Sequence, residues 1–144
     1  MHKIKHGLFE VHNLAEQVAE LYERQVALDN GGNFIIEQTT AMTVVDVNSG
    51  QYIGSDPAKM VDIINIAAAD KICKQLSLRK ISGLVVIDFL KYAKKAERLK
   101  FSEYLLKLAK VYKFELGSLT NFGLAEFKIS RTTKNIDEKI LDMT

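Results

Sequence analysis

The chain has 144 residues, of which 47% are hydrophobic and 26% are charged, and its formal net charge at pH 7 is +2. This length fits one domain with a real core, and the hydrophobic content supports a folded globule. The single cysteine, Cys73, excludes a disulfide within the chain and is expected to be a small buried group. The sequence shows no signal-peptide pattern and no run of eighteen apolar residues, so we expect a cytoplasmic bacterial protein without a membrane partner.

Charge is unevenly distributed along the chain. Residues 10–30 have a local balance of −4, whereas residues 91–113 hold seven lysines and Arg98 against two glutamates, a balance of +6. Such a cluster of cations attracts the phosphate backbone of a nucleic acid. A solvated helix face gives the same pattern, so both interpretations of the basic segment stay open.

The first predicted element is an amphipathic helix over residues 8–28, where apolar side chains recur at helical spacing. The turn-forming segment 29–32, Asp-Asn-Gly-Gly, is expected to end this helix. Two short apolar runs follow at 34–36 and 42–47, and the few polar residues between them favour an antiparallel hairpin.

A helix is predicted over Pro57–Leu78, with Asp56 or Ser55 as its N-cap. It is apolar on nearly every side, which is typical of a helix that packs on a sheet and can also contact a partner. Asn65 lies within it, and a buried amide requires hydrogen-bond partners. The β-branched run Gly83–Phe89 then predicts another strand.

The last third of the chain begins with a second amphipathic helix, predicted over residues 94–113. Two further strands are expected at 114–119 and 123–130, joined around Asn121. From Thr132 onward the sequence is polar, so residues 132–144 are expected to form a frayed or weakly helical tail.

Two of the predicted strands deliver an aspartate at or near their ends, Asp46 and Asp88. A strand, a helix and a second strand form a right-handed crossover, which makes the two strands parallel. Parallel strands finish at the same edge of a sheet, where open α/β sheets bind ligands, so the two side chains are expected to share one cleft. Two neighbouring carboxylates repel unless a proton or a cation lies between them, and Mg²⁺ suits such a pair because it takes one or two protein carboxylates and keeps water and phosphate ligands.

The same residues resemble a known family. The turn Asp-Val-Asn-Ser at 46–49, the apolar strand that ends in Asp-Phe at 88–89, and the Phe-Gly-Leu segment at 122–124 look like the catalytic core of the ribonuclease E/G family. The resemblance runs in order from about Leu8 to Arg131. It implies an α/β fold with a mixed β-sheet, a parallel β-α-β crossover and flanking helices, the deoxyribonuclease I-like subdomain of that family.

Function and site residues follow from the resemblance as expectations. Asp46 and Asp88 would hold a catalytic Mg²⁺, with Mn²⁺ as a possible substitute, and Asn48 would orient one carboxylate. Asn65 would make a structural hydrogen bond near the site. The implied activity is hydrolysis of single-stranded RNA by a metal-activated water.

The resemblance also implies an organisation. Residues 1–28 would be a helix that closes a ribonuclease H-like part, residues 29–131 the deoxyribonuclease I-like catalytic subdomain, and residues 132–144 a polar tail. The chain has no counterpart of the family's OB-fold RNA-binding module or of its cysteine zinc link, so no zinc is expected. A homodimer, or a companion chain that supplies the OB-fold module, is the expected assembly.

Five positions near the expected site depart from the family pattern by losing a polar or charged group, or by replacing an acidic group with a basic one. They are Thr40, the segment 51–53, Ala67, Lys91 and Ile129. Candidate RNA contacts are drawn from the basic segment and from two loops. They are Lys91, Lys94, Lys95, Tyr52 and Asn121.

Three interpretations therefore compete. The chain is the core of an active endoribonuclease, or a binding and dimerising remnant of that family in which turnover is lost. In the third, it is an ordinary α/β domain whose strand-end aspartates only cap loops, and divalent ions then leave its melting temperature unchanged.

Overall fold

The computed structural model describes residues 23–131, which form six strands and two helices. Most of the predicted helix over 8–28 and the whole tail 132–144 lie outside the described residues. The strands are β1 (Gln25–Ala27), β2 (Asn33–Gln38), β3 (Thr43–Asn48), β4 (Gly83–Asp88), β5 (Glu115–Leu119) and β6 (Leu124–Ile129). The helices are α2 (Pro57–Leu78) and α3 (Lys95–Tyr112).

All six strands belong to one mixed sheet in the order β1-β2-β3-β4-β6-β5. The central pair, β3 and β4, is parallel, and every other neighbouring pair is antiparallel. Helix α2 connects β3 to β4, so the predicted parallel crossover is confirmed, as are the mixed sheet and the hairpin of β2 with β3.

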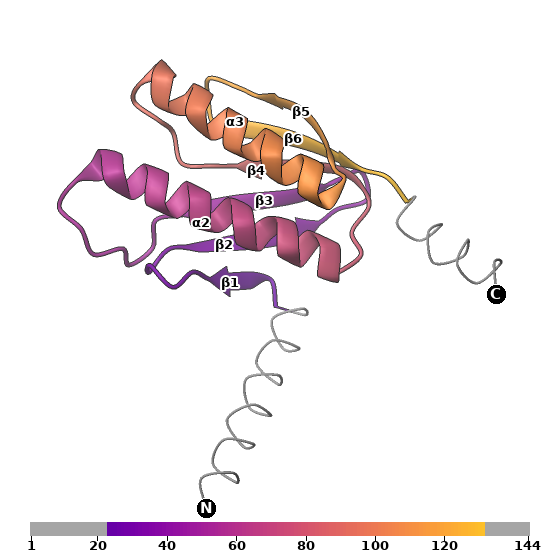
Figure 1. The fold of residues 1–144 in the computed structure, drawn as a ribbon. Coiled ribbons are helices and arrows are strands. Elements are labelled where there is room, and N and C mark those ends of the chain that lie inside the picture. The colour runs from indigo at the N-terminus through magenta and orange to yellow at the C-terminus, as the bar shows by residue number, and fades with distance from the viewer. Residues whose placement is uncertain (1–22, 132–144) are drawn as a thin grey trace, which may run out of the picture.

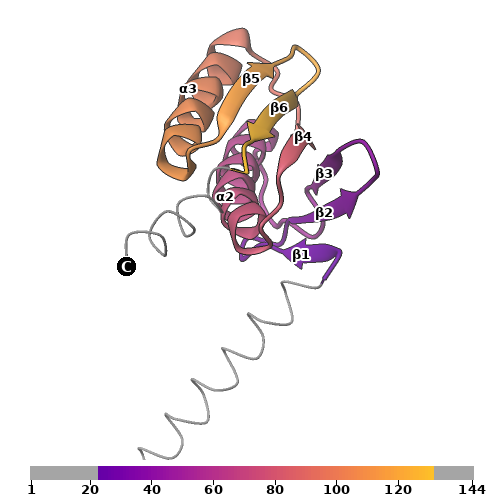
Figure 2. The same cartoon turned by 90° about the vertical axis from the view of Figure 1, so that its right-hand side faces the viewer.

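Both helices cover the same face of this sheet, as two perpendicular views show (Figure 1, Figure 2). Alternate strand residues point into the helix layer, and among them Phe34, Val45, Val85 and Phe127 are at most 1% exposed. The face of the sheet away from the helices has no covering layer within residues 23–131. We call it the open face.

Helix α2 has the bounds that its sequence predicts because its start is well specified. Asp56 adopts an extended conformation and accepts a hydrogen bond from the Ala58 amide at 3.0 Å, and Pro57 is the first helical residue. Its buried stripe includes Ile64, Ile72 and Cys73, so the predicted burial of the thiol is confirmed. The helix was predicted to be apolar on nearly every side, whereas in the structure it has a polar outer surface on which Asp62 and Asp70 are exposed.

A second sequence prediction, the C-terminal bound of the first helix, is wrong within the described residues. The helix expected to run to residue 28 does not include residues 25–27, which form β1 and pair with β2. Val26 is 1% exposed, and its burial beside Phe34 in the sheet outweighs the weak helical periodicity of this segment. Neither helix within residues 23–131 combines the length and hydropathy that a membrane span requires.

Candidate functional site

Asp46 and Asp88 are register partners on the two central strands. Because β3 and β4 run parallel, both aspartates lie near the C-terminal ends of these two strands, and Asp88 is the last residue of β4. Both residues are exposed, whereas the residues beside them in sequence, Val45, Val47 and Ile87, are at most 4% exposed in the helix-covered layer. The strand alternation therefore directs both carboxylates to the open face.

The two carboxylates influence each other. The pKa of Asp88 is raised above its ordinary value, first because partial burial disfavours the charged form, and second because the negative charge of Asp46 lies close by. Lys91 acts in the opposite direction and lowers the pKa of Asp88. The pair is therefore a place where negative charge is crowded and a cation is favoured.

Asn48 lies on the same face as Asp46, two residues further along β3. Its amide nitrogen donates to Oδ1 of Asn33 at 3.4 Å, so its partner in this structure is a neighbouring side chain and not an aspartate. The loop that follows is tightly packed. A Cβ at Gly50, whose φ is +55°, would lie 2.6 Å from the Gly31 carbonyl oxygen, which fixes the backbone next to Asn48.

Asn65 secures the chain immediately after Asp88. This side chain is fully buried, and its amide donates to the Leu90 carbonyl at 2.8 Å while its Oδ1 accepts from the Leu90 amide at 2.9 Å. The hydrogen bonds expected of a buried amide near the site are thus present. They attach the loop that carries Lys91 to helix α2.

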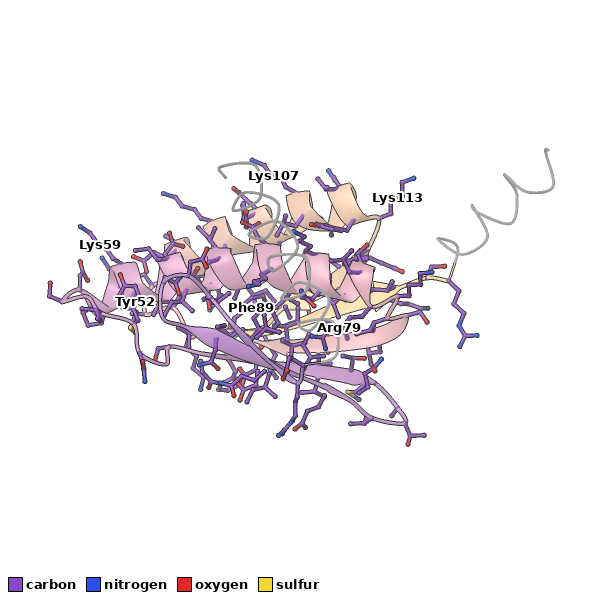
Figure 3. The ribbon with its side chains drawn as sticks, turned by 90° about the horizontal axis from the view of Figure 1, so that it is seen from below. Tyr52, Lys59, Arg79, Phe89, Lys107 and Lys113 are labelled. Atoms are coloured by element: carbon purple, nitrogen blue, oxygen red, sulfur yellow. The ribbon has the colours of Figure 1, made fainter. Side chains whose placement is uncertain are left out.

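The basic segment separates into two parts in space. Lys91 is close enough to Asp88 to change its pKa, whereas Tyr92, the next residue, already donates to Asp62 of α2 at 3.0 Å. Lys94 and Lys95 follow at the exposed start of α3. Further along the segment, Lys107 of α3 and Lys113, the residue that follows α3, point away from the sheet (Figure 3). The basic helix therefore lies in the layer opposite the carboxylates, and Lys91 is the part of the segment that reaches them.

The remaining predicted RNA contacts lie in two loops. Tyr52 is half-buried against the core in the loop between β3 and α2, which favours a packing role (Figure 3). Asn121 is exposed in the turn between β5 and β6. This turn leads into Leu124, the first residue of β6 and the register partner of Asp88. Phe122, the neighbour of Asn121, belongs to the Phe-Gly-Leu segment that carries the family resemblance, but no role of its own was assigned to it from the sequence. The signal in the sequence that could have indicated a role is an aromatic residue inside a polar turn. In the structure, the Phe122 side chain is 68% exposed.

The residues at the pair fit a hard divalent cation. Within residues 23–131, no three His, Cys, Asp or Glu side chains gather as a metal-binding group, so Asp46 and Asp88 offer two carboxylates and leave the other coordination positions to water or substrate. Mg²⁺ is bound in this way at many phosphate-processing sites. The positive charge would also relieve the repulsion that raises the pKa of Asp88.

Two hollows of about 760 and 590 Å³ lie elsewhere on the described surface. The first is beside Arg24 and Arg79, and the second lies between α2 and α3, with Phe101 and Tyr104 in its lining. Neither is lined by Asp46 or Asp88. Both aspartates are exposed on the open face, a setting that suits an extended polymer better than an enclosed small molecule.

Fold and site together define an α/β domain that presents paired carboxylates from two parallel strands on an open sheet face. Comparison with known proteins gives the family. A model of the ribonuclease E/G family matches residues 1–132, and the chain belongs to this family. The resemblance expected from the sequence is thereby confirmed.

Its relatives include proteins named ribonuclease E and proteins named ribonuclease G. The chain is 34% identical over 140 residues to ribonuclease E of Nostoc sp. PCC 7120, a match that covers 95% of this chain and 20% of the relative. It is 32% identical over 136 residues to ribonuclease G of Salmonella typhimurium SL1344, covering 90% and 27%. It is 29% identical over 134 residues to ribonuclease E of Escherichia coli K12, covering 91% and 13%. The chain thus spans less than a third of the length of each of these relatives.

Proposed function

We propose that this chain is the catalytic core of a metal-dependent endoribonuclease, which hydrolyses phosphodiester bonds of single-stranded RNA during RNA processing and decay in the cytoplasm. The observation that supports this most strongly is the parallel register of Asp46 and Asp88 on the open face. The relatives' names, ribonuclease E and ribonuclease G, support the substrate class.

Asp46 and Asp88 would hold Mg²⁺, or Mn²⁺ in its place, and Asn48 would orient the ligands from the end of β3. When bound, such an ion stabilises charge on the phosphate and lowers the pKa of a water molecule. In this proposal the hydrogen bonds between Asn65 of α2 and the backbone of Leu90 keep Asp88 and Lys91 in place. Lys91 attracts the phosphate backbone.

The thiol of Cys73 is a poor nucleophile for this chemistry. It is 1% exposed, and burial raises its pKa to about 12, so it stays protonated near neutral pH. This is consistent with water as the attacking group.

The proposed partners are single-stranded RNA on the open face and a second protein unit, either another copy of this chain or a companion that supplies an OB-fold RNA-binding module. The second candidate function is a binding or dimerising remnant that retains the fold and the cation but has lost turnover; it is favoured by Asn48, whose amide nitrogen donates to Asn33 and not to an aspartate.

The test is cleavage of an A/U-rich single-stranded RNA by the full 144-residue chain in Mg²⁺ or Mn²⁺. Asp46→Asn and Asp88→Asn are each expected to lower the rate by more than about 100-fold, because loss of a direct metal ligand exceeds the 10–100-fold cost of losing an outer partner. Glu103→Gln is the matched control, since Glu103 is an exposed carboxylate of α3 in the opposite layer.

Cleavage that survives both aspartate substitutions would contradict the proposed mechanism. No cleavage by the wild-type chain, together with Mg²⁺-dependent stabilisation that both substitutions abolish, would favour the remnant. Cleavage restored by an added OB-fold module would show that turnover by these 144 residues requires that module.

A further inference from the structure

The turn between β5 and β6 brings an exposed aromatic ring to the carboxylate pair. Phe122 is 68% exposed, and Leu124, two residues later, is the register partner of Asp88. The amide of Phe89, which directly follows Asp88, donates to the Gly123 carbonyl at 3.0 Å. The backbone beside Phe122 is therefore attached to the backbone beside Asp88.

Hydrogen bonds hold this turn in one shape. Oγ1 of Thr120 accepts from the amides of Phe122 and Leu124 at 3.3 and 3.1 Å, and the Gly123 amide donates to the Thr120 carbonyl at 3.1 Å. Gly123 has a φ of +84°, and a Cβ there would lie 2.8 Å from the Phe89 carbonyl oxygen. Close packing against β4 thus fixes the backbone that presents the ring.

A cation lies over the ring. Nζ of Lys91 is 5.7 Å from the ring centroid of Phe122, and the same lysine is near enough to Asp88 to lower the pKa of that carboxyl. Ring, ammonium group and carboxylate pair are therefore neighbours on one surface.

Exposure alone would not distinguish Phe122, because single exposed apolar residues are common. Ile53 and Val111 are 96% and 74% exposed, but neither has a flat aromatic face or a cation above it. The exposed neighbours of Phe122 include the polar Asn121 and the cationic Lys91, together with Leu124, which is 37% exposed. A protein-docking patch would favour apolar neighbours, whereas a ring flanked by a cation matches the base and phosphate of a nucleotide.

We propose that Phe122 is a stacking platform for one nucleobase of single-stranded RNA, with Lys91 binding the adjacent phosphate, so that the strand is positioned across Asp46 and Asp88. This rests on the proposed function and adds a substrate-binding residue to it. Stacking accepts every base, so the platform would fix the position of the strand without selecting its sequence.

The chain contains no tryptophan, which allows a direct test. Phe122→Trp in the full chain places a single reporter indole at the platform, and Val111→Trp is the matched control on the outer surface of α3. Titration with an A/U-rich RNA oligonucleotide, in Ca²⁺ in place of Mg²⁺ to suppress cleavage, is expected to quench the emission of F122W and to leave that of V111W unchanged. In parallel, the anisotropy of labelled RNA is expected to show about tenfold weaker binding by Phe122→Leu and wild-type affinity for F122W.

Unchanged RNA affinity of Phe122→Leu, or unchanged emission of F122W at saturating RNA, would overturn the stacking proposal. A change in sedimentation from dimer to monomer in Phe122→Leu, with RNA affinity retained, would overturn it in favour of a protein contact. These readouts need no cleavage, so they are separate from the proposed function, which fails if cleavage is independent of Asp46 and Asp88. Failure of the wild-type chain to bind RNA at all would overturn the stacking proposal as well.

Discussion

The helix-covered face of the sheet and the open face are built by alternate residues of the same strands. On the covered face the chain supplies its own partner, because α2 and α3 bury side chains such as Phe34 and Val45 (Figure 2). On the open face Asp46 and Asp88 remain exposed, and Phe122 is exposed in the turn that joins β5 to β6 beside them. One face is thus built for stability, while the other leaves charge and aromatic surface available for a ligand, and the two faces should respond differently to mutation.

The largest expected effect is on the covered face. Phe34→Ala removes a fully buried ring and is expected to lower the free energy of unfolding by about 3–5 kcal/mol. Phe122→Ala is the matched substitution on the exposed turn and is expected to change it by less than about 0.5 kcal/mol. Urea unfolding of both variants measures the difference. Equal destabilisation would mean that Phe122 is part of the core and would remove the contrast between the faces.

The next effect concerns the connection between the faces. Asn65→Leu leaves the amide and carbonyl of Leu90 without their partners, at a cost of about 2–3 kcal/mol in unfolding free energy. Because the loop it secures follows Asp88 directly, affinity for divalent ions should fall as well. Urea unfolding and calorimetric titration with Mn²⁺ would test both parts. A stable variant with unchanged Mn²⁺ affinity would show that the loop needs no such support.

A smaller effect is expected for the two groups of lysines. Lys91→Ala should weaken RNA binding by about tenfold or less and lower the slope of log K against log salt by about one, as expected for one lost phosphate contact. Lys107→Ala removes the same charge from the helix layer and should leave that slope nearly unchanged (Figure 3). Equal slopes for the two variants would favour the solvated-face interpretation of the whole basic segment.

The smallest expected effect is that of Asp88→Asn on the free energy of unfolding in the absence of metal. The raised pKa of Asp88 means that the folded state holds this proton more tightly than the unfolded state. The stabilisation from protonated Asp88 is therefore fully present at pH values below the pKa that Asp88 has in the unfolded chain. It is lost as the pH rises through the pKa that Asp88 has in the folded state. At pH 7 in EDTA, Asp88→Asn should be more stable than wild type by about 0.5 kcal/mol, a small value because solvent screens the pair. Thermal melts at pH 3 and pH 7 should show this advantage only at pH 7, and an advantage at both values would assign it to another cause.

The elements of this fold were predictable where one local pattern decided the structure. Pro57 after Asp56 specified the start of α2, and the β-branched runs that end near Asp46 and Asp88 specified the central strands. Strand β1 was missed because three residues give little periodicity, and the pairing that stabilises it comes from β2. Local pattern does not contain such a tertiary contact.

The candidate site was predictable in part for the same reason. The parallel crossover alone implied that Asp46 and Asp88 share an edge, and their register agrees. The sequence could not show that the lysines of α3 face away from this edge, since that depends on which face of the sheet the helix covers (Figure 1). The sequence placed Phe122 in a family-like segment but assigned it no role, because its position beside Asp88 depends on a turn that packs on a strand far away along the chain.

The most direct test of the central claim, a divalent ion shared by two strand-end carboxylates, is Mn²⁺ binding followed by electron paramagnetic resonance and calorimetry on the full chain. The account predicts one Mn²⁺ bound per chain and displaced by Mg²⁺, a melting temperature that rises with the ion, and loss of both in Asp46→Asn and in Asp88→Asn. Glu103→Gln should bind as wild type does. Binding that persists in both aspartate variants, or a wild-type melting temperature that is indifferent to Mn²⁺ and Mg²⁺, would contradict the account and favour an ordinary α/β domain.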